Sequence, residues 1–287
     1  AEEIEKQNYG QDLPYLLESM PATVVTSDAG AGIGYTSFRI RGVDPTRTNI
    51  TVDGIPMNDG ESQGVFWVNM PDFSSSVESM QVQRGVGTSS NGGGAFGASI
   101  NIATNKLQQK PYAIIDNSGG SFNSIRNSVN VGTGMMNNKF TVDARLSRIK
   151  SEGYIDRASA DLKSYFLSGA YHGKKSTLRL NIFSGKEKTY QAWYGTPESR
   201  INGNEQEMID YAGRNELSDS DLENLLNSGR TYNAYTYENE TDNYQQDHYQ
   251  LHYAYQFNKH WNMKAAAHYT RGLGYYENYE TDDKFSK

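Results

Sequence analysis

This 287-residue chain contains no cysteine, which excludes a disulfide framework and a thiolate metal site. It also lacks an excess of positive charge, because 27 lysines and arginines stand against 34 aspartates and glutamates, a net charge of −7. Nucleic-acid-binding proteins normally carry a basic excess, so we expect no nucleic acid as a partner. No apolar run in the sequence approaches the ~18 residues that a transmembrane helix needs.

Patterns typical of catalysis are missing too. The glycine-rich segment 92–99 has no lysine after its glycines, so it is not a phosphate-binding loop. His248 and His252 share a face of a predicted strand but stand ~13 Å apart at ~3.3 Å per residue, too far to chelate one ion. No Ser/His/Asp arrangement stands out. We therefore predict no enzyme, no catalytic residue, no cofactor and no metal.

The first 110 residues combine glycine loops with short strands. A short helix is predicted between Gly10 and Pro21, and strands are predicted within 77–85 and 98–105. The Asp-Gly pair at positions 53–54 is a turn signal between apolar β-formers. These signals predict a compact α+β domain. Arg39, Arg41 and Arg47 lie among the apolar residues of its predicted small sheet.

From residue 111 onward the hydrophobic period is two. Phe140, Val142 and Leu146 share one face of a predicted strand, whereas Asp143 and Arg145 occupy the other. Strands of ~10 tilted residues are long enough to cross the hydrocarbon layer of a bilayer. Seven such strands are predicted, at 111–118, 124–132, 139–149, 162–172, 176–186, 245–257 and 261–271.

The connections between these strands also point to a membrane. After the first link, short and long connections alternate, and the longest covers residues 187–244. Tight periplasmic turns and long outer loops are typical of transmembrane β-barrels. Because seven strands leave an open edge that lipid does not tolerate, we predict part of a larger barrel. A soluble β-sandwich with aromatic strands is the alternative.

Four motifs in the first half carry a family resemblance. They are "FRIRG", "VDGIP", "VESMQVQRG" and "GAFGASINIAT", and they occur in this order. Together they resemble the plug domain of TonB-dependent outer-membrane receptors. The resemblance implies a plug at residues 1–109 inside a transmembrane antiparallel β-barrel of roughly 22 strands, of which residues 110–287 supply about seven. The segment 61–72 is similar to Bacteroidetes-type receptors, and the motifs do not resemble the starch-utilisation subgroup.

In such a fold the plug sits in a polar lumen, where charged groups must be paired. We therefore expect the plug arginines to pair with barrel carboxylates or with plug acids, and the glycines to mark tight turns or close approach to the wall. The residues predicted to join plug and barrel are Arg39, Arg41, Gly42, Asp53, Gly54, Glu78, Arg84 and Gly85.

The resemblance also places the ligand site at the outward plug loops and the long barrel loop. The predicted ligand-binding residues are Tyr35, Asn58, Asp59, Phe66, Trp67, Asn91, Trp193 and Tyr194. Local packing of the loops is the alternative for each of them. Aromatic and polar residues at a mouth suit bulky amphiphilic ligands.

The function implied by the resemblance is ligand-gated import across the bacterial outer membrane. The expected ligand is a scarce large nutrient, a ferric siderophore first and then haem or cobalamin. The expected partners are the lipid bilayer and TonB of the inner-membrane complex, which supplies the energy. Two alternatives stay open: a passive pore or surface adhesin, and a glycan or peptide importer with a surface lipoprotein partner.

Overall fold

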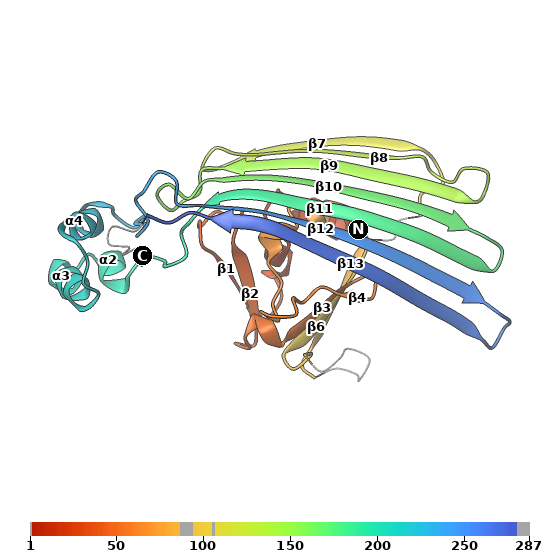
Figure 1. Cartoon of the computed structure of the whole chain (residues 1–287), viewed down its shortest axis with the longest axis horizontal. Helices are drawn as coiled ribbons and strands as arrows, with labels where there is room; N and C mark the ends of the chain where they lie inside the picture. The colour runs from red at the N-terminus through yellow and green to blue at the C-terminus, as the bar shows by residue number, and fades with distance from the viewer. Residues whose placement is uncertain (1, 87–93, 105–106, 280–287) are drawn as a thin grey trace, which may run out of the picture.

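The computed structural model describes residues 2–86, 94–104 and 107–279. A small domain lies in the hollow of a long, curved antiparallel sheet, and three helices project beyond one end of that sheet (Figure 1). We call the small domain the plug and the sheet the wall. We call the end with the helices the outer end and the opposite end the inner end.

The plug contains two small sheets and several single turns of 3-10 helix. β1 (Thr23–Ser27) pairs with β2 (Thr36–Ile40), and the second sheet has the order β4-β3-β6-β5. Its strands are β3 (Thr48–Val52), β4 (Ile55–Pro56), β5 (Ser79–Arg84) and β6 (Ala98–Ala103). The helical elements are α1 (Glu2–Gln7), η1 (Leu13–Leu17), η2 (Pro45–Arg47), η3 (Trp67–Asn69) and η4 (Phe73–Ser76).

The local signals explain most of these elements. Asp53 and Gly54 both have positive φ, at 52° and 84°, as a two-residue hairpin turn between β3 and β4 requires. The helix predicted after Gly10 is shorter than expected, since only the five residues of η1 are helical. Phe38, Ile50 and Ile100 lie in the apolar core between the two sheets. The strands at 77–85 and 98–105 are confirmed as β5 and β6.

The wall is a seven-stranded meander in the order β13 to β7. All seven predicted strands are confirmed, and most of them extend two to five residues further at the outer end. They are β7 (Tyr112–Gly120), β8 (Ser124–Gly132), β9 (Phe140–Ser151), β10 (Ala160–His172), β11 (Ser176–Tyr190), β12 (Thr241–Gln256) and β13 (Asn262–Tyr276).

The two faces of the wall have opposite character. On β9, Phe140, Val142 and Leu146 are exposed on the convex face, whereas Thr141 and Arg145 are buried against the plug. The predicted alternation is thus confirmed, with the apolar side chains pointing outward. A soluble sheet that covers a domain buries its apolar face, so this inverted pattern is typical of a wall that faces lipid.

The connection between β11 and β12 forms a small folded unit at the outer end. It contains α2 (Glu198–Asn202), α3 (Glu205–Arg214) and α4 (Asp219–Asn227). Ser218 caps α4 by accepting a hydrogen bond from the backbone N–H of Asp221, a role that serine favours at the start of a helix. Met208, Leu225 and Tyr232 form a separate small core for this unit. None of the helices in the described ranges is long and apolar enough to cross a membrane.

Candidate functional site at the plug and wall interface

Asp72 of the plug is the centre of the strongest contact with the wall. Its Oδ1 accepts a hydrogen bond from Nε of Arg126 at 2.8 Å, and its Oδ2 forms an ion pair with Nη1 of Arg145 at 3.2 Å. Asp72 adopts φ +52°, a left-handed conformation that Asp tolerates. All three side chains are at least nine-tenths buried. Burial alone raises the pKa of Asp72, but Arg145 and Arg126 outweigh it and hold that pKa below its usual range.

A second ion pair joins the Asp53 turn to the wall. Oδ2 of Asp53 lies 3.2 Å from Nη2 of Arg179 on β11 and accepts a hydrogen bond from Nδ2 of Asn181 at 3.0 Å. Within the plug, the same carboxylate accepts hydrogen bonds from the backbone and side chain of Thr104. Asp53 therefore fixes a plug turn, the end of β6 and the wall at one point. A buried charge in this position is stable because both carboxylate oxygens accept hydrogen bonds and Arg179 supplies the opposite charge.

Close apolar packing reinforces these ion pairs. Phe73 of the plug contacts Phe166 and Phe183 of the wall, with ring centroids 6.3 and 5.3 Å away. Gly185 of β11 lies against the plug at the turn before η4, where a Cβ would collide with the carbonyl oxygen of Asn69. Ser164 of β10 donates a hydrogen bond to the carbonyl oxygen of Pro71 at 2.7 Å. The segment 69–73 is thus fixed to the wall by shape as well as charge.

The ion pairs across this interface differ from the first of the two expected pairings. We expected the plug arginines to pair with wall carboxylates or with plug acids, and the ion pairs found join plug carboxylates to wall arginines. Arg39 and Arg41 are exposed, and neither forms an ion pair within the described part of the chain. Arg84 donates a hydrogen bond to the carbonyl oxygen of Pro21 inside the plug. These arginines lie on plug surfaces that the seven strands of the wall do not cover.

The remaining predicted junction residues have mixed roles. Asp53 touches the wall as described, and Glu78 lies beside the cavity described next. Gly42, Gly54 and Gly85 all have positive φ. A Cβ added to any of the three would meet no atom within 4 Å, so each serves a turn and not a close approach to these strands.

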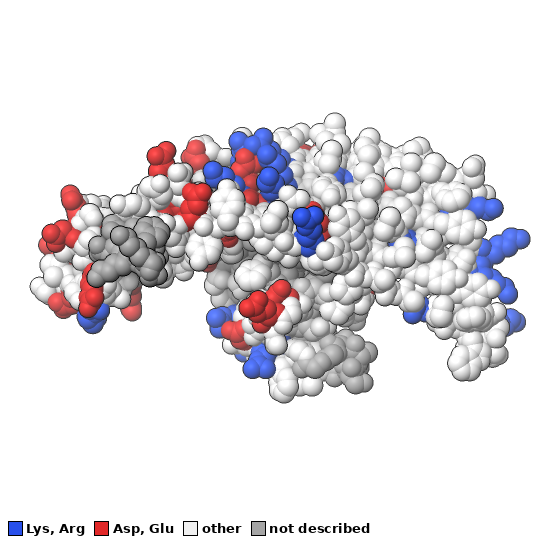
Figure 2. Space-filling view, viewed as in Figure 1, with Lys and Arg blue, Asp and Glu red and all other residues white. Residues whose placement is uncertain are grey.

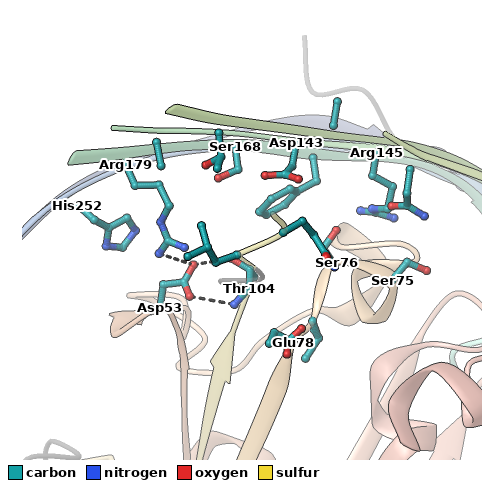
Figure 3. A pocket seen from close by; sticks show the side chains of 18 of the residues that line it. Asp53, Ser75, Ser76, Glu78, Thr104, Asp143, Arg145, Ser168, Arg179 and His252 are labelled. Carbon is teal, nitrogen blue, oxygen red and sulfur yellow. Dashed lines mark hydrogen bonds and ion pairs between the residues drawn. The ribbon is translucent and has the colours of Figure 1, made fainter. Parts of the chain in front are cut away.

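A cavity of about 840 Å³ lies between the plug and the inner half of the wall. Figure 3 shows Asp53, Thr104 and Glu78 on its plug side, facing Arg179 and His252 on its wall side. The ion pair between Asp53 and Arg179 stands at the edge of this space, so any movement of the 53–54 turn changes its width. Among the described residues, no group of three His, Asp or Glu side chains has the geometry of a metal site.

An aromatic cluster forms the contact at the outer end. Tyr35, at the start of β2, donates a hydrogen bond to Oδ2 of Asp242 on β12 and packs edge-on against Trp193, with centroids 5.8 Å apart. Trp193 in turn contacts Tyr235 and Tyr276, and Tyr194 stacks on Tyr235 at 5.2 Å. The structure therefore brings together three of the predicted ligand residues, Tyr35, Trp193 and Tyr194.

Carboxyl groups gather beneath this aromatic cluster. Burial raises the pKa of Asp12 to about 7, although Thr36 donates a hydrogen bond to it, and burial raises the pKa of Asp28 to about 6. Burial first, and then the nearby Glu187 and Asp242, raises the pKa of the Tyr35 hydroxyl. No ion pair to any of these carboxyl groups is recorded among the described residues. The carboxyl groups of Asp12 and Asp28 are therefore partly protonated near neutral pH.

The other predicted ligand residues have different surroundings. Phe66 is exposed, and Asp59 is an exposed loop residue that accepts hydrogen bonds from the backbone of Glu61 and Ser62. Asn58 is committed to the plug, because it accepts a hydrogen bond from Ile50 and donates one to Thr48. The expectation for Trp67 is wrong: its side chain is 3% exposed in the plug core, against Phe38. Asn91 lies outside the described residues.

The outer loop holds all of the net charge of the chain. Residues 191–240 contain ten acidic and three basic residues, a balance of −7, so the rest of the chain is neutral. Figure 2 shows acidic side chains scattered over the helical unit at the outer end. A ligand that enters past this loop meets a negative potential, which opposes a strongly anionic ligand.

The residues predicted to join plug and wall did not include the wall arginines 126, 145 and 179 or the plug acid Asp72. A signal for them was present: Arg126, Arg145 and Arg179 fall on the polar face of alternating strands. A charged side chain on the wall face that is covered by the plug needs a partner of opposite charge. The carboxylates of the plug are those partners. Asp72 gave no signal of its own, because an aspartate before a serine run is common in loops.

Comparison with known proteins finds likenesses to one kind of receptor. Residues 1–99 match the family described as TonB-dependent Receptor Plug Domain. A probable TonB-dependent siderophore receptor, PirA of Acinetobacter baumannii, is 28% identical over 125 residues, which are 40% of this chain and 17% of that protein. The ferric enterobactin receptor of Pseudomonas aeruginosa is 31% identical over 114 residues, which are 36% of this chain and 15% of that protein.

The fold likeness extends over the wall as well. The crystal structure of the ferric-catecholate import receptor Fiu from Escherichia coli K12, in its open form, matches 96% of this chain and 38% of that one. The TM-score is 0.69 at 18% sequence identity, which shows a shared fold. The chain thus spans less than half of that solved chain, and its matched regions span less than a fifth of the two sequence relatives.

Proposed function

We propose that this chain, whose residues 1–99 match the family described as TonB-dependent Receptor Plug Domain, forms the plug and part of the wall of a ligand-gated importer in the bacterial outer membrane. The observation that carries the proposal is the plug held in the hollow of a wall whose apolar face points outward. A plug of this kind blocks passive flow, and a wall of this kind faces lipid. The activity of a whole receptor is part of this proposal, because the chain spans less than half of the solved receptor chain that it matches.

The contacts at the two ends of the interface suggest how gating works. At the outer end, Tyr35 of the plug touches both Trp193 of the outer loop and Asp242 of the wall. A ligand that displaces Trp193 changes the surroundings of a plug residue directly. At the inner half, the Asp53–Arg179 pair borders the cavity that a displaced plug would widen. TonB supplies the energy for that displacement in this proposal.

The ligand class we favour is a ferric siderophore, with haem or cobalamin as further candidates. The sequence relatives are a probable siderophore receptor and a ferric enterobactin receptor, which supports iron chelates as the class. The exposed Tyr194 and Trp193 give flat apolar surfaces for such a ligand. The charge of −7 on residues 191–240 favours a chelate of low negative charge over a highly anionic one.

Uptake of radioactive iron by cells that carry the full receptor tests this function. Cells starved of iron are given ferric complexes of a neutral hydroxamate, a catecholate and haem, with and without a functional TonB. We expect uptake of at least one complex that requires both receptor and TonB. Uptake that continues without TonB would favour the passive pore, and growth on glycans or peptides in place of iron would favour the lipoprotein-assisted importer.

A matched pair of variants locates the site. Trp193→Ala removes the ring between the outer loop and Tyr35, so we expect uptake to fall at least tenfold. Trp261→Ala, in the inner turn between β12 and β13, removes a ring of the same size far from the mouth, so uptake should be unchanged. Equal loss in both variants would place the defect in folding and not in ligand capture.

A further inference from the structure

A basic patch lies on the convex face of the wall near its outer end. It consists of Arg148 and Lys150 on β9, Lys163 on β10, and Lys186 and Lys188 on β11, all of them exposed. Their sequence neighbours Ser147, Ile149, Leu162 and Glu187 are buried on the opposite face. Figure 2 shows basic side chains gathered on this part of the surface. The patch faces away from the plug, so transport through the lumen does not explain it.

The register of the strands sets like charges directly opposite one another. Lys163 pairs in register with Arg148 on one side and with Lys186 on the other, which gives three cations in one row. Like charges directly opposite on neighbouring strands are destabilising. Asp161 is the single acid within the patch, and it already pairs with Arg148 at 2.6 Å and Lys150 at 3.8 Å. Lys163, Lys186 and Lys188 have no ion pair among the described residues. The described residues therefore supply too few anions to neutralise this row of cations, and a bound molecule could supply them.

The row of cations lies at the outer border of the apolar, convex face. On β9 the outward residues from Phe140 to Leu146 are apolar or small, and the basic residues begin at Arg148. Eight residues at a rise of ~3.4 Å, tilted by ~40°, cover about 21 Å across the membrane, close to the ~25 Å height of a lipid-facing band. The row thus stands where the headgroups of the outer leaflet begin.

We propose that the basic patch binds the phosphate groups of an outer-leaflet lipid. Phosphate oxygens accept charge-assisted hydrogen bonds from several cations at once, and a guanidinium beside lysines suits that geometry. The lipid chains would then lie along the exposed Leu146, Tyr165 and Leu167 just below the row. One bound headgroup would relieve the repulsion between Arg148, Lys163 and Lys186. This site is separate from the ligand mouth and does not depend on what the receptor transports.

The test uses the full receptor in neutral detergent, with bisphosphorylated lipid A as the probe. Bound lipid is counted by native mass spectrometry, and dephosphorylated lipid A and inorganic phosphate are run in parallel. The test variant is Lys163→Gln with Lys186→Gln. The control, Lys174→Gln with Lys175→Gln, removes two exposed lysines from the inner turn between β10 and β11. We expect the test variant to bind lipid A at least tenfold more weakly and the control to bind like the wild type.

Thermal unfolding gives a second readout. Without lipid, the test variant should be at least as stable as the wild type, because it has lost repelling charges. With lipid A, the wild type should gain more stability than the variant. Equal affinity of wild type and test variant overturns the proposal. The proposal is also overturned if the control variant loses as much lipid A affinity as the test variant, or if dephosphorylated lipid A binds as tightly as the bisphosphorylated form. Stabilisation of the wild type by inorganic phosphate alone would overturn it as well.

Discussion

The plug meets the wall in two zones that differ in chemistry. In the first zone, along the middle and inner half of the wall, Asp72 and Asp53 are buried and paired with three wall arginines, and Phe73 packs between wall rings. In the outer zone, Tyr35 makes one hydrogen bond and edge-on ring contacts, above carboxyl groups without a cation. Separating the ion pairs of the first zone costs much free energy, because it leaves buried charges without partners. The contacts of the outer zone change with small shifts of the outer loop.

A plug that moves when ligand binds needs one region that holds it in the wall and another that responds to the ligand. Buried ion pairs fix position because breaking one leaves a charge in a dry site. Aromatic contacts and neutral carboxyls exchange partners at lower free-energy cost, so they suit the end that meets a ligand.

Asp72→Asn should give the largest effect. It leaves Arg126 and Arg145 buried without their carboxylate, which costs about 3–5 kcal/mol of plug–wall stability. Hydrogen exchange of residues 69–77 in the full receptor measures this loss as faster opening. Ser75→Ala is the matched control, because it removes a hydrogen-bond donor to the same carboxylate and leaves the charges paired. Unchanged exchange in Asp72→Asn would show that the ion pairs do not hold the plug.

Asp12→Asn should change the pH dependence of the outer zone. The pKa of Asp12 is about 7 in the folded plug and about 3.9 in an unfolded chain. Between these values the folded state binds more protons, so stability falls as pH rises from about 4 to about 7. In wild type we expect a loss of about 2–4 kcal/mol over that window from this group.

The variant should lack most of this slope. Asn cannot ionise, so the stability of segment 11–17 should stay nearly constant from pH 4 to 7, apart from the smaller contribution of Asp28, whose pKa is about 6. Hydrogen exchange at several pH values, corrected for intrinsic rates, measures it. Identical slopes in wild type and variant would mean that Asp12 stays ionised when buried.

Tyr35→Phe should have an intermediate effect. It keeps the ring against Trp193 and removes the hydrogen bond to Asp242, which costs about 1.5 kcal/mol. Exchange at the tip of the β1–β2 hairpin should increase about tenfold, while exchange around Asp72 should not change. Tyr9→Phe, at a largely exposed tyrosine, serves as the control. Faster exchange in both zones would show that they are coupled and not independent.

Asp161→Asn should have the smallest effect on stability. Its ion pair with Arg148 is exposed on the convex face, where water screens the charges, so the thermal midpoint should stay within error. Because it removes the acid from the basic patch, the variant should instead bind bisphosphorylated lipid A more tightly. A clear loss of stability in lipid-free detergent would show that the ion pair holds β9 to β10.

Much of the fold could be read from the sequence because its signals are local. Strict alternation from residue 111 onward predicts seven strands, and the structure has all seven. The Asp-Gly pair at 53–54 gives the hairpin turn it predicts, and Ser218 caps α4. The helix expected after Gly10 became a single turn, η1, and α2 and α3 were not predicted, since short polar loop helices carry little periodicity.

The partners across the interface could not be read in the same way. Trp67 looked like a loop aromatic, yet the tertiary fold turns η3 into the plug core. Arg39 and Arg41 were predicted to join plug and wall, and that role stays a prediction. Which arginine faces which acid depends on how the plug is rotated in the wall, and no local pattern encodes that rotation.

Local sequence is sufficient to predict the polarity of each wall strand, the turn chemistry of the plug and the charge of the outer loop, because each depends on residues close together in the chain. The position of Asp72 between Arg126 and Arg145 and the contact of Tyr35 with Trp193 arise from the tertiary fold instead. The same fold also sets Arg148, Lys163 and Lys186 in one row. These contacts join residues 15 to 158 positions apart, and such pairings follow from register and docking, which minimise the free energy of the whole assembly.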